Sequence, residues 1–374
     1  MEKPSNYFSI IMDSNKNPFF YSIKNISIIL LLIVGVFSLS FLSSFSSKSL
    51  LSSKFLQCPS LPRPNETAVL QPFQKDELDE ALEKASMKDN KTVIIAVVNK
   101  AYVEGEVVPN MLDLFLEGFW AGENTRELVN HLMIVAVDQT AYDRCRYRGL
   151  HCYRLVTDGV DFMGEKIFMS KDFIKMMWSR TLFLTDILKK GYNFIFTDTD
   201  VVWLRNPLKV LTTNRTRHFD IQLSTDNFNG NSSSTSNAIN TGFYFVKSNN
   251  KTISLFEKWY GLKDNSTGLK EQDVLQNMIW HGELKKMGIR ARFLNTRYFS
   301  GFCQDSRDIR SVVTVHSNCC RYISAKVADL RRVLHDWGRF KAAPANVTRS
   351  LRWSPHVECV KSWRRNNVES GNKI

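Results

Sequence analysis

The stretch Phe194-Ile-Phe-Thr-Asp-Thr-Asp-Val-Val-Trp203 places two carboxylates, one residue apart, directly after a short apolar run. That run, from Tyr192 to Phe196, is typical of a buried strand. Alternate residues of an extended segment face the same side, so Asp198 and Asp200 can converge on one divalent cation. Hard divalent cations prefer oxygen ligands and bridge phosphate oxygens. The alternative interpretation is a solvated turn that binds nothing.

Apolar runs and helix-like segments alternate on both sides of this motif. The order predicts an α/β fold with a mixed, mostly parallel, Rossmann-like sheet flanked by helices. Ligands of such sheets bind beyond the carboxyl ends of the strands, so polar residues directly after strands are the first candidates for chemistry. Strands are expected over 92–98, 132–138, 192–196, 219–223, 239–246, 289–294 and 312–316, and helices over 109–122, 170–191, 271–286 and 325–340.

The N-terminal region predicts a membrane anchor. Residues 26–45, ISIILLLIVGVFSLSFLSSF, carry no charge, and a helix of this length spans a bilayer. A cleaved signal peptide is the rival interpretation, but its apolar region would be only about 7–15 residues long. We expect a cytosolic tail over 1–25, a transmembrane signal-anchor over 26–45 and a Ser- and Pro-rich stem over 46–88.

Sequons and cysteines agree with a lumenal location for the rest of the chain. Cys145 and Cys152 could close a short loop, and Cys303 could pair with Cys319 or Cys320. The odd total of seven cysteines leaves at least one without an intramolecular partner. The glycosylation sequons downstream of the anchor are a modest excess over chance, at Asn65, Asn90, Asn214, Asn231, Asn250, Asn265 and Asn346.

Composition excludes several classes of protein. With 43% apolar and 23% charged residues, the chain is neither disordered, collagen-like nor a multi-span membrane protein. Residues 286–374 hold 18 Lys and Arg against 6 Asp and Glu, which is most of the net charge of +13. This excess has two interpretations: an anionic ligand such as a diphosphate or an acidic polysaccharide, or a solvated basic face. No nucleic-acid-binding signature accompanies the basic region, so we expect no nucleic-acid partner.

Two enzyme classes carry paired aspartates after an apolar strand. In haloacid-dehalogenase phosphatases the motif usually opens the fold, and a later Gly-Asp-x-x-x-Asp motif follows. Here more than a hundred residues of α/β chain precede Asp198, and that later motif is absent. GT-A-type glycosyltransferases carry the motif mid-domain, after a nucleotide-binding half, which favours the second class. The alternatives are a metal-dependent phosphohydrolase and a lumenal glycan-binding protein without turnover.

Five pieces of sequence between residues 90 and 340 make this assignment specific. They are Met177-Trp-Ser-Arg-Thr-Leu182, Phe196-Thr-Asp-Thr-Asp-Val-Val-Trp-Leu-Arg-Asn-Pro207, Asn240-Thr-Gly-Phe243, Glu271-Gln-Asp273 and Val315-His-Ser-Asn-Cys-Cys320. In this order they resemble the plant nucleotide-diphospho-sugar transferases of glycosyltransferase family 77. The resemblance implies a GT-A fold, a UDP-sugar donor, Mn²⁺ or Mg²⁺, and retention of anomeric configuration. We assign residues 89–345 to this domain and 346–374 to a basic C-terminal tail.

The same pieces suggest a metal site. Asp198, Asp200 and the strand-ending His316 are the expected ligands, because an imidazole can complete a site begun by two carboxylates. Arg180 has two interpretations. The resemblance implies that it faces the donor, whereas a buried arginine could simply pair with Asp186 or another carboxylate.

The remaining candidates contact the donor or the acceptor. Asn240 offers hydrogen bonds to sugar hydroxyls and Gly242 allows a ligand to approach the backbone, although both would also suit a plain strand entry. Arg321 and Lys326 are candidates for the diphosphate, but a glycine expected near Tyr322 is absent, which leaves the shape of that loop open.

Gln272 and Asp273 open a predicted helix, where the helix dipole alone favours a carboxylate. The resemblance implies that they contact sugar or acceptor and act in catalysis. We therefore expect a single-pass type II Golgi membrane protein whose lumenal domain transfers a sugar from a UDP donor. The acceptor would be a cell-wall polysaccharide or a glycoprotein, and a homo- or hetero-oligomer is left open.

Overall fold

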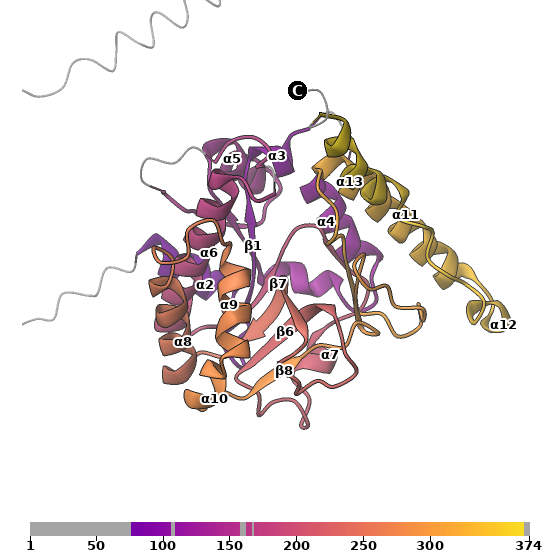
Figure 1. The fold of residues 1–374 in the computed structure, drawn as a ribbon. Coiled ribbons are helices and arrows are strands. Elements are labelled where there is room, and N and C mark those ends of the chain that lie inside the picture. The colour runs from indigo at the N-terminus through magenta and orange to yellow at the C-terminus, as the bar shows by residue number, and fades with distance from the viewer. Residues whose placement is uncertain (1–75, 106–108, 158–161, 167, 370–374) are drawn as a thin grey trace, which may run out of the picture. The chain divides into compact units, whose positions relative to one another are not determined.

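The main sheet has β1 and β4 at its centre, hydrogen-bonded side by side in parallel. The computed structural model describes residues 76–105, 109–157, 162–166 and 168–369. The strand order is β3-β2-β1-β4-β7-β6-β8, and only β7 runs antiparallel to its neighbours. Figure 1 shows β7, β6 and β8 side by side at one end of this sheet. The predicted mixed, mostly parallel sheet is confirmed, and it agrees with the GT-A-type fold that the resemblance implies. The strands are β1 Thr92–Val98, β2 Leu132–Ala136, β3 His151–Arg154, β4 Asn193–Thr197, β6 Ile221–Asn227, β7 Ala238–Val246 and β8 Ala291–Phe293.

Helices cover both faces of this sheet because its central strands are apolar on both sides. Val93 and Ile95 pack under α2, α6, α8 and α9, whereas Ile94 and Ala96 pack under α4 and α5 on the opposite face. This explains the nearly continuous apolar run of β1. The helices are α2 Glu77–Ala85, α4 Met111–Ala121, α5 Gln139–Tyr147, α6 Lys171–Lys189, α8 Asn250–Gly261 and α9 Glu271–Trp280, with short turns α3 Lys100–Val103, η1 Arg126–His131 and α7 Leu208–Leu211.

Local signals set the ends of the helices near the site. The Ser170 hydroxyl accepts a hydrogen bond from the Phe173 amide and starts α6, which stops just before Gly191 at φ +81°. The single helix predicted over 271–286 is in fact two, α9 and α10 (Glu283–Lys286), because Gly282 between them adopts φ +73°. The strands β3, β5 (Val201–Trp203) and β9 (Phe299–Gly301), of three or four residues each, were not predicted.

The predicted anchor over 26–45 and the cytosolic tail lie outside the described residues, as does the stem up to residue 75. Helix α2 falls within the range predicted as stem, yet Leu78 and Leu82 pack into the core. Among the helices that the structure describes, none has the length and apolarity needed to cross a bilayer.

A second, three-stranded sheet brings His316 next to the Asp198–Asp200 motif. It consists of β5 Val201–Trp203, β10 Thr314–His316 and β9 Phe299–Gly301, in the order β5-β10-β9. β10 pairs antiparallel with β5 so that His316 lies opposite Val201, one residue beyond Asp200. In the main sheet, the pairing of β4 with β7 lets the Asp198 amide donate to the Gly242 carbonyl at 2.7 Å. Strand register therefore decides which distant residues meet at the motif.

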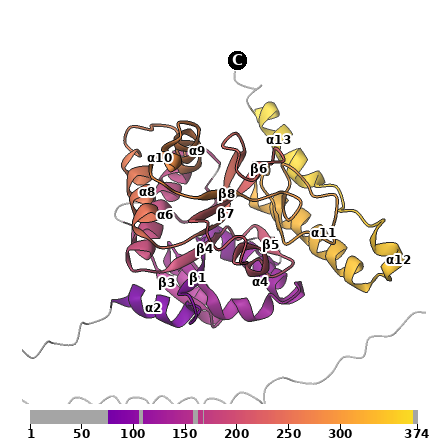
Figure 2. The same cartoon turned by 90° about the horizontal axis from the view of Figure 1, so that it is seen from below.

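The C-terminal region completes the domain on one side of β5. Helix α11, Ile323–Ala342, packs on α4, and α13, Val357–Glu369, lies along α11 (Figure 2). The range predicted as a basic tail thus contains α13 as well as the short α12, Ala345–Thr348. The disulfides among the described residues are Cys145–Cys152, Cys303–Cys319 and Cys320–Cys359, and Cys58 lies outside those residues.

Candidate active site

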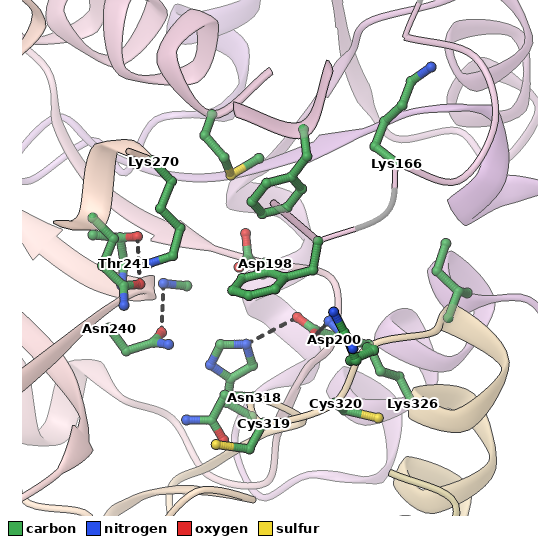
Figure 3. A pocket seen from close by; sticks show the side chains of 18 of the residues that line it. Lys166, Asp198, Asp200, Asn240, Thr241, Lys270, Asn318, Cys319, Cys320 and Lys326 are labelled. Carbon is green, nitrogen blue, oxygen red and sulfur yellow. Dashed lines mark hydrogen bonds and ion pairs between the residues drawn. The ribbon is translucent and has the colours of Figure 1, made fainter. Parts of the chain in front are cut away.

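Asp198, Asp200 and His316 converge as predicted. Each offers one ligand atom, and these atoms lie within 4.8 Å of one another, so the three side chains could hold a metal ion. Both aspartates follow β4, and Figure 3 shows them facing the same space. His316 Nε2 lies 3.3 Å from Asp200 Oδ1. The donor set of two carboxylates and one imidazole fits a divalent cation such as Mn²⁺.

Asp200 is the anchored member of this cluster. Its side chain is only 4% exposed, and Lys326 Nζ donates to its Oδ2 at 2.7 Å. The Ser317 hydroxyl donates to the same oxygen at 3.1 Å, and the Ser317 amide donates to the Asp200 carbonyl at 3.0 Å. Lys326, predicted to contact phosphate, therefore lies beside the metal cluster and neutralises Asp200.

Asp198 is more open, with 36% of its side chain exposed, and it is held by Arg180. The Arg180 guanidinium donates to Asp198 at 3.0 Å and to Glu271 at 2.5 Å, and it lies over the Phe196 ring at 4.4 Å. With Arg180 3% and Glu271 1% exposed, this is a buried ion-pair network. The partners of Arg180 are thus two other carboxylates and not Asp186.

The ionisation of the cluster follows from these contacts. Burial raises the pKa of Asp198 to about 6, although Arg180 opposes the rise. Burial would also raise the pKa of Asp200, but the charges of Lys326 and His316 outweigh it and hold that pKa well below its usual range. Burial lowers the pKa of His316, and the Asp200 carboxylate more than reverses this. Both carboxylates are therefore ionised at neutral pH, as cation binding requires.

Gly242 lies on β7 where three polar groups crowd the backbone. A Cβ built there would lie 2.7 Å from Asp198 Oδ2 and 2.9 Å from Asn240 Oδ1, and it would collide with His316. The Asn240 side chain accepts from the Gly242 amide at 2.7 Å and donates to Asp226 at 2.9 Å. Gly242 therefore gives the metal cluster its space, and Asn240 is held in place by its neighbours.

The start of α9 contributes Gln272 but not Asp273 to the pocket wall. Gln272 Oε1 accepts from the Thr241 amide at 3.0 Å, and Gln272 lines the pocket. Asp273 is absent from the pocket lining; its carboxylate accepts from the Lys270 amide at 3.3 Å and from Lys270 Nζ at 2.8 Å. In this structure Asp273 therefore caps the helix and holds Lys270, which does line the pocket.

The loop after His316 contains a left-handed backbone turn that the sequence did not predict. Cys319 adopts φ +52°, the left-handed region where glycine is usual, and its disulfide with Cys303 fixes it there. The left-handed residue of this loop is thus a cysteine, three residues before Tyr322. Arg321, which follows, lines the pocket.

All predicted site residues except Asp273 line one pocket of about 260 Å³. Sequence reasoning did not assign roles to several other polar residues in its wall. Asp226 near the end of β6 is one that could have been found, since it is a carboxylate at a strand end. The unassigned polar or aromatic residues that line the pocket include Tyr102, Glu165, Lys166, Asp226, Thr241, Lys270, Glu271, Asn318 and Trp363.

Comparisons with known proteins agree with this geometry. A family model described as nucleotide-diphospho-sugar transferase matches residues 127–330. The uncharacterized protein At1g28695 of Arabidopsis thaliana is 57% identical over 294 residues, which is 78% of this chain and 85% of that protein.

Two more distant relatives have transferase names. The beta-arabinofuranosyltransferase RAY1 of Arabidopsis thaliana is 28% identical over 49% of this chain and 32% of its own length. The UDP-galactose:fucoside alpha-3-galactosyltransferase of Dictyostelium discoideum is 27% identical over 37% of this chain and 24% of its own length. The family model covers more than half of the chain, including the Asp-Asp-His cluster. The family predicted from the resemblance is therefore confirmed: the chain belongs to the nucleotide-diphospho-sugar transferases.

Proposed function

We propose that this protein is a metal-dependent glycosyltransferase that moves a sugar from a UDP-sugar to a glycan or glycoprotein acceptor, with retention of configuration. The observation that carries the proposal is the convergence of Asp198, Asp200 and His316 in a pocket of a chain from this family. The Dictyostelium relative is named as a UDP-galactose-dependent transferase, which supports a UDP donor. Hexosyl and pentosyl transfer are both compatible with the relatives' names.

The charge balance of the cluster supports a bound divalent cation. When His316 is neutral, as metal ligation requires, the ion-pair network carries one more negative than positive charge. Burial lowers the pKa of His316 but Asp200 raises it by more, so a proton on the imidazole balances this charge without metal, and a bound cation would take over that role. When bound, the metal would stabilise the departing diphosphate as a Lewis acid. The network consists of Asp198, Asp200 and Glu271 against Arg180 and Lys326.

The other side chains bind and orient the substrates. Arg321, which no acidic side chain of the described residues neutralises, would face the diphosphate, with Lys326 behind the metal ligands. Asn240 and Arg180 line the region beside Asp198 where the donor sugar is expected. Gln272 is the better placed of the two predicted catalytic residues because its side chain lines the pocket. It would position the acceptor hydroxyl or the donor sugar by hydrogen bonds.

We also infer a Golgi location, with the N-terminal anchor over 26–45 and a lumenal domain. Two observations support a lumenal setting. The three disulfides are typical of proteins matured in an oxidising compartment. The sequon asparagines within the described residues are all exposed, at Asn90, Asn214, Asn231, Asn250, Asn265 and Asn346.

The test is titration of Mn²⁺ and UDP into the full-length protein and its variants. Asp200→Asn should lose Mn²⁺ affinity and, with it, UDP affinity and metal-dependent donor hydrolysis. The loss of a buried carboxylate that compensates a cation costs on the order of 3–5 kcal/mol. His316→Ala should weaken Mn²⁺ binding less, because water can take its place.

Asp264→Ala is the control, since Asp264 is 89% exposed and lies outside the pocket lining. It should behave as wild type. The proposal is wrong if Asp200→Asn binds Mn²⁺ and UDP as tightly as the wild-type protein. Release of inorganic phosphate from simple phosphomonoesters, without cleavage of any UDP-sugar, would instead identify a phosphohydrolase.

A further inference from the structure

One wall of the pocket comes from α13, beyond the part of the chain that the family model matches. That match ends at residue 330, whereas Trp363 on α13 lines the same pocket as Asp198 and Asp200. Donor and metal binding are common to the family and should depend on the matched region. A pocket wall outside it is therefore a candidate for recognition of the second substrate.

The Trp363 ring is held in a fixed orientation although 44% of the residue is exposed. Its Nε1 donates to the Cys319 carbonyl at 2.7 Å, and the Arg321 guanidinium lies over the ring at 4.8 Å. The disulfide Cys320–Cys359 fixes α13 one turn before Trp363. A hydrogen-bonded, stacked ring that stays open to solvent is preorganised for binding.

Ser362 couples this helix to the pocket loop. It is 2% exposed; its hydroxyl donates to the Cys359 carbonyl at 2.6 Å and accepts from the Arg321 amide at 3.1 Å. The buried Nε of Arg321 has no hydrogen-bond partner among the described residues. Ser362, and not the indole of Trp363, holds the backbone of Arg321.

We propose that Trp363 forms the acceptor subsite of the proposed transferase, where its indole stacks against the apolar face of an acceptor sugar ring. Aromatic side chains supply large, rigid, amphipathic contact surfaces, and a sugar ring presents C–H groups on one face and hydroxyls at its edge. Arg321, whose guanidinium lies over one face of the indole, leaves the other face for the sugar and can donate hydrogen bonds toward the same substrates. This inference rests on the proposed function and adds to it the residue that recognises the acceptor.

The alternative occupant of the ring is the uracil base of the donor. The donor is common to the family, so its base should contact residues inside the matched region 127–330. Trp363 lies beyond that region, on α13, and contacts the loop that follows His316. We therefore assign Trp363 to the acceptor.

The experiment compares Trp363→Ala and Trp363→Phe with wild type, as full-length proteins. UDP affinity in the presence of Mn²⁺ is measured by calorimetry. Acceptor binding is measured on an array of immobilised oligogalacturonides, arabino-oligosaccharides, xylo-oligosaccharides, galacto-oligosaccharides and N-glycans. For the glycans that wild type binds on the array, Trp363→Ala should lower the affinity by about tenfold or more. Trp363→Phe should keep most of the wild-type affinity. UDP affinity should stay within about twofold of wild type in both variants.

Trp120→Ala is the matched control. Trp120 is 55% exposed and lies under Arg126 at 4.3 Å, but it is not part of this pocket. It should leave glycan binding unchanged. The inference is wrong if wild type retains no glycan, if Trp363→Ala retains them equally well, or if that variant loses UDP affinity. Failure of wild type to bind UDP would overturn the proposed function instead. The glycan array measures acceptor binding independently of UDP binding, so the two failures can be told apart.

Discussion

Substitution of Gly242 by alanine tests whether the metal cluster needs the space that a residue without a Cβ leaves at this position. The new Cβ would lie 2.7 Å from Asp198 Oδ2 and 2.9 Å from Asn240 Oδ1, and it would overlap His316. Carbon atoms do not tolerate such contacts, so the ligands must move. The atoms that crowd the site are the ends of side chains, so the strand itself can remain in place.

Two magnitudes follow from this crowding. Overpacking of a buried site costs about 1–3 kcal/mol of unfolding free energy. Displacement of metal ligands costs more in function, because disturbance of groups that orient ligands lowers metal affinity by about 10–100-fold. We therefore expect Gly242→Ala to fold with modest loss of stability and to bind Mn²⁺ about 10–100-fold more weakly than wild type.

The assay is Mn²⁺ titration by calorimetry, together with urea unfolding of the metal-free protein. Gly338→Ala is the control, because a Cβ at Gly338 on α11 meets no atom within 4 Å. This variant should be more stable by about 0.5–1 kcal/mol, since alanine favours a helix over glycine. Wild-type Mn²⁺ affinity in Gly242→Ala would refute the view that this position gives the cluster its space.

The remaining predictions concern stability. Arg180→Ala should lower the free energy of unfolding by about 3–5 kcal/mol, because it leaves the buried Glu271 carboxylate without a compensating charge; equal urea midpoints for variant and wild type would contradict this. Simultaneous replacement of Cys320 and Cys359 by serine should cost about 3–4 kcal/mol, since their disulfide closes a loop with a sequence separation of 39. Urea unfolding measures the stability of this double variant. Limited proteolysis should cut it first near α13. Protease resistance equal to that of wild type would argue against the predicted role of this disulfide.

The sequence predicted the metal cluster because the signal is local. Asp198 and Asp200 follow an apolar strand, and His316 ends another, so each lies at a strand end, where ligand-binding residues are expected. What the sequence does not state is the strand register, and it is the pairing of His316 with Val201 that brings the imidazole to the carboxylates.

Long-range polar partners were beyond sequence reasoning. Arg180 pairs with Glu271, 91 residues away, and no periodicity links these positions. Asp273 looked equivalent to its neighbours, yet it faces Lys270 because helix geometry turns successive residues by about 100°. The left-handed turn was also hidden, because glycine usually marks it and here Cys319 adopts it.

The vicinal cysteines at 319 and 320 make assembly of the pocket depend on correct oxidation. Each forms a bond to a different segment, Cys303 upstream and Cys359 near the end of the chain. During synthesis Cys303 meets both neighbours before Cys359 has emerged, so an early bond to Cys320 would be a kinetic trap that thiol exchange must repair. A recombinant product truncated at residue 345 would leave Cys320 without its native partner. Production of active protein therefore calls for the whole C-terminal region and a host compartment with a disulfide isomerase.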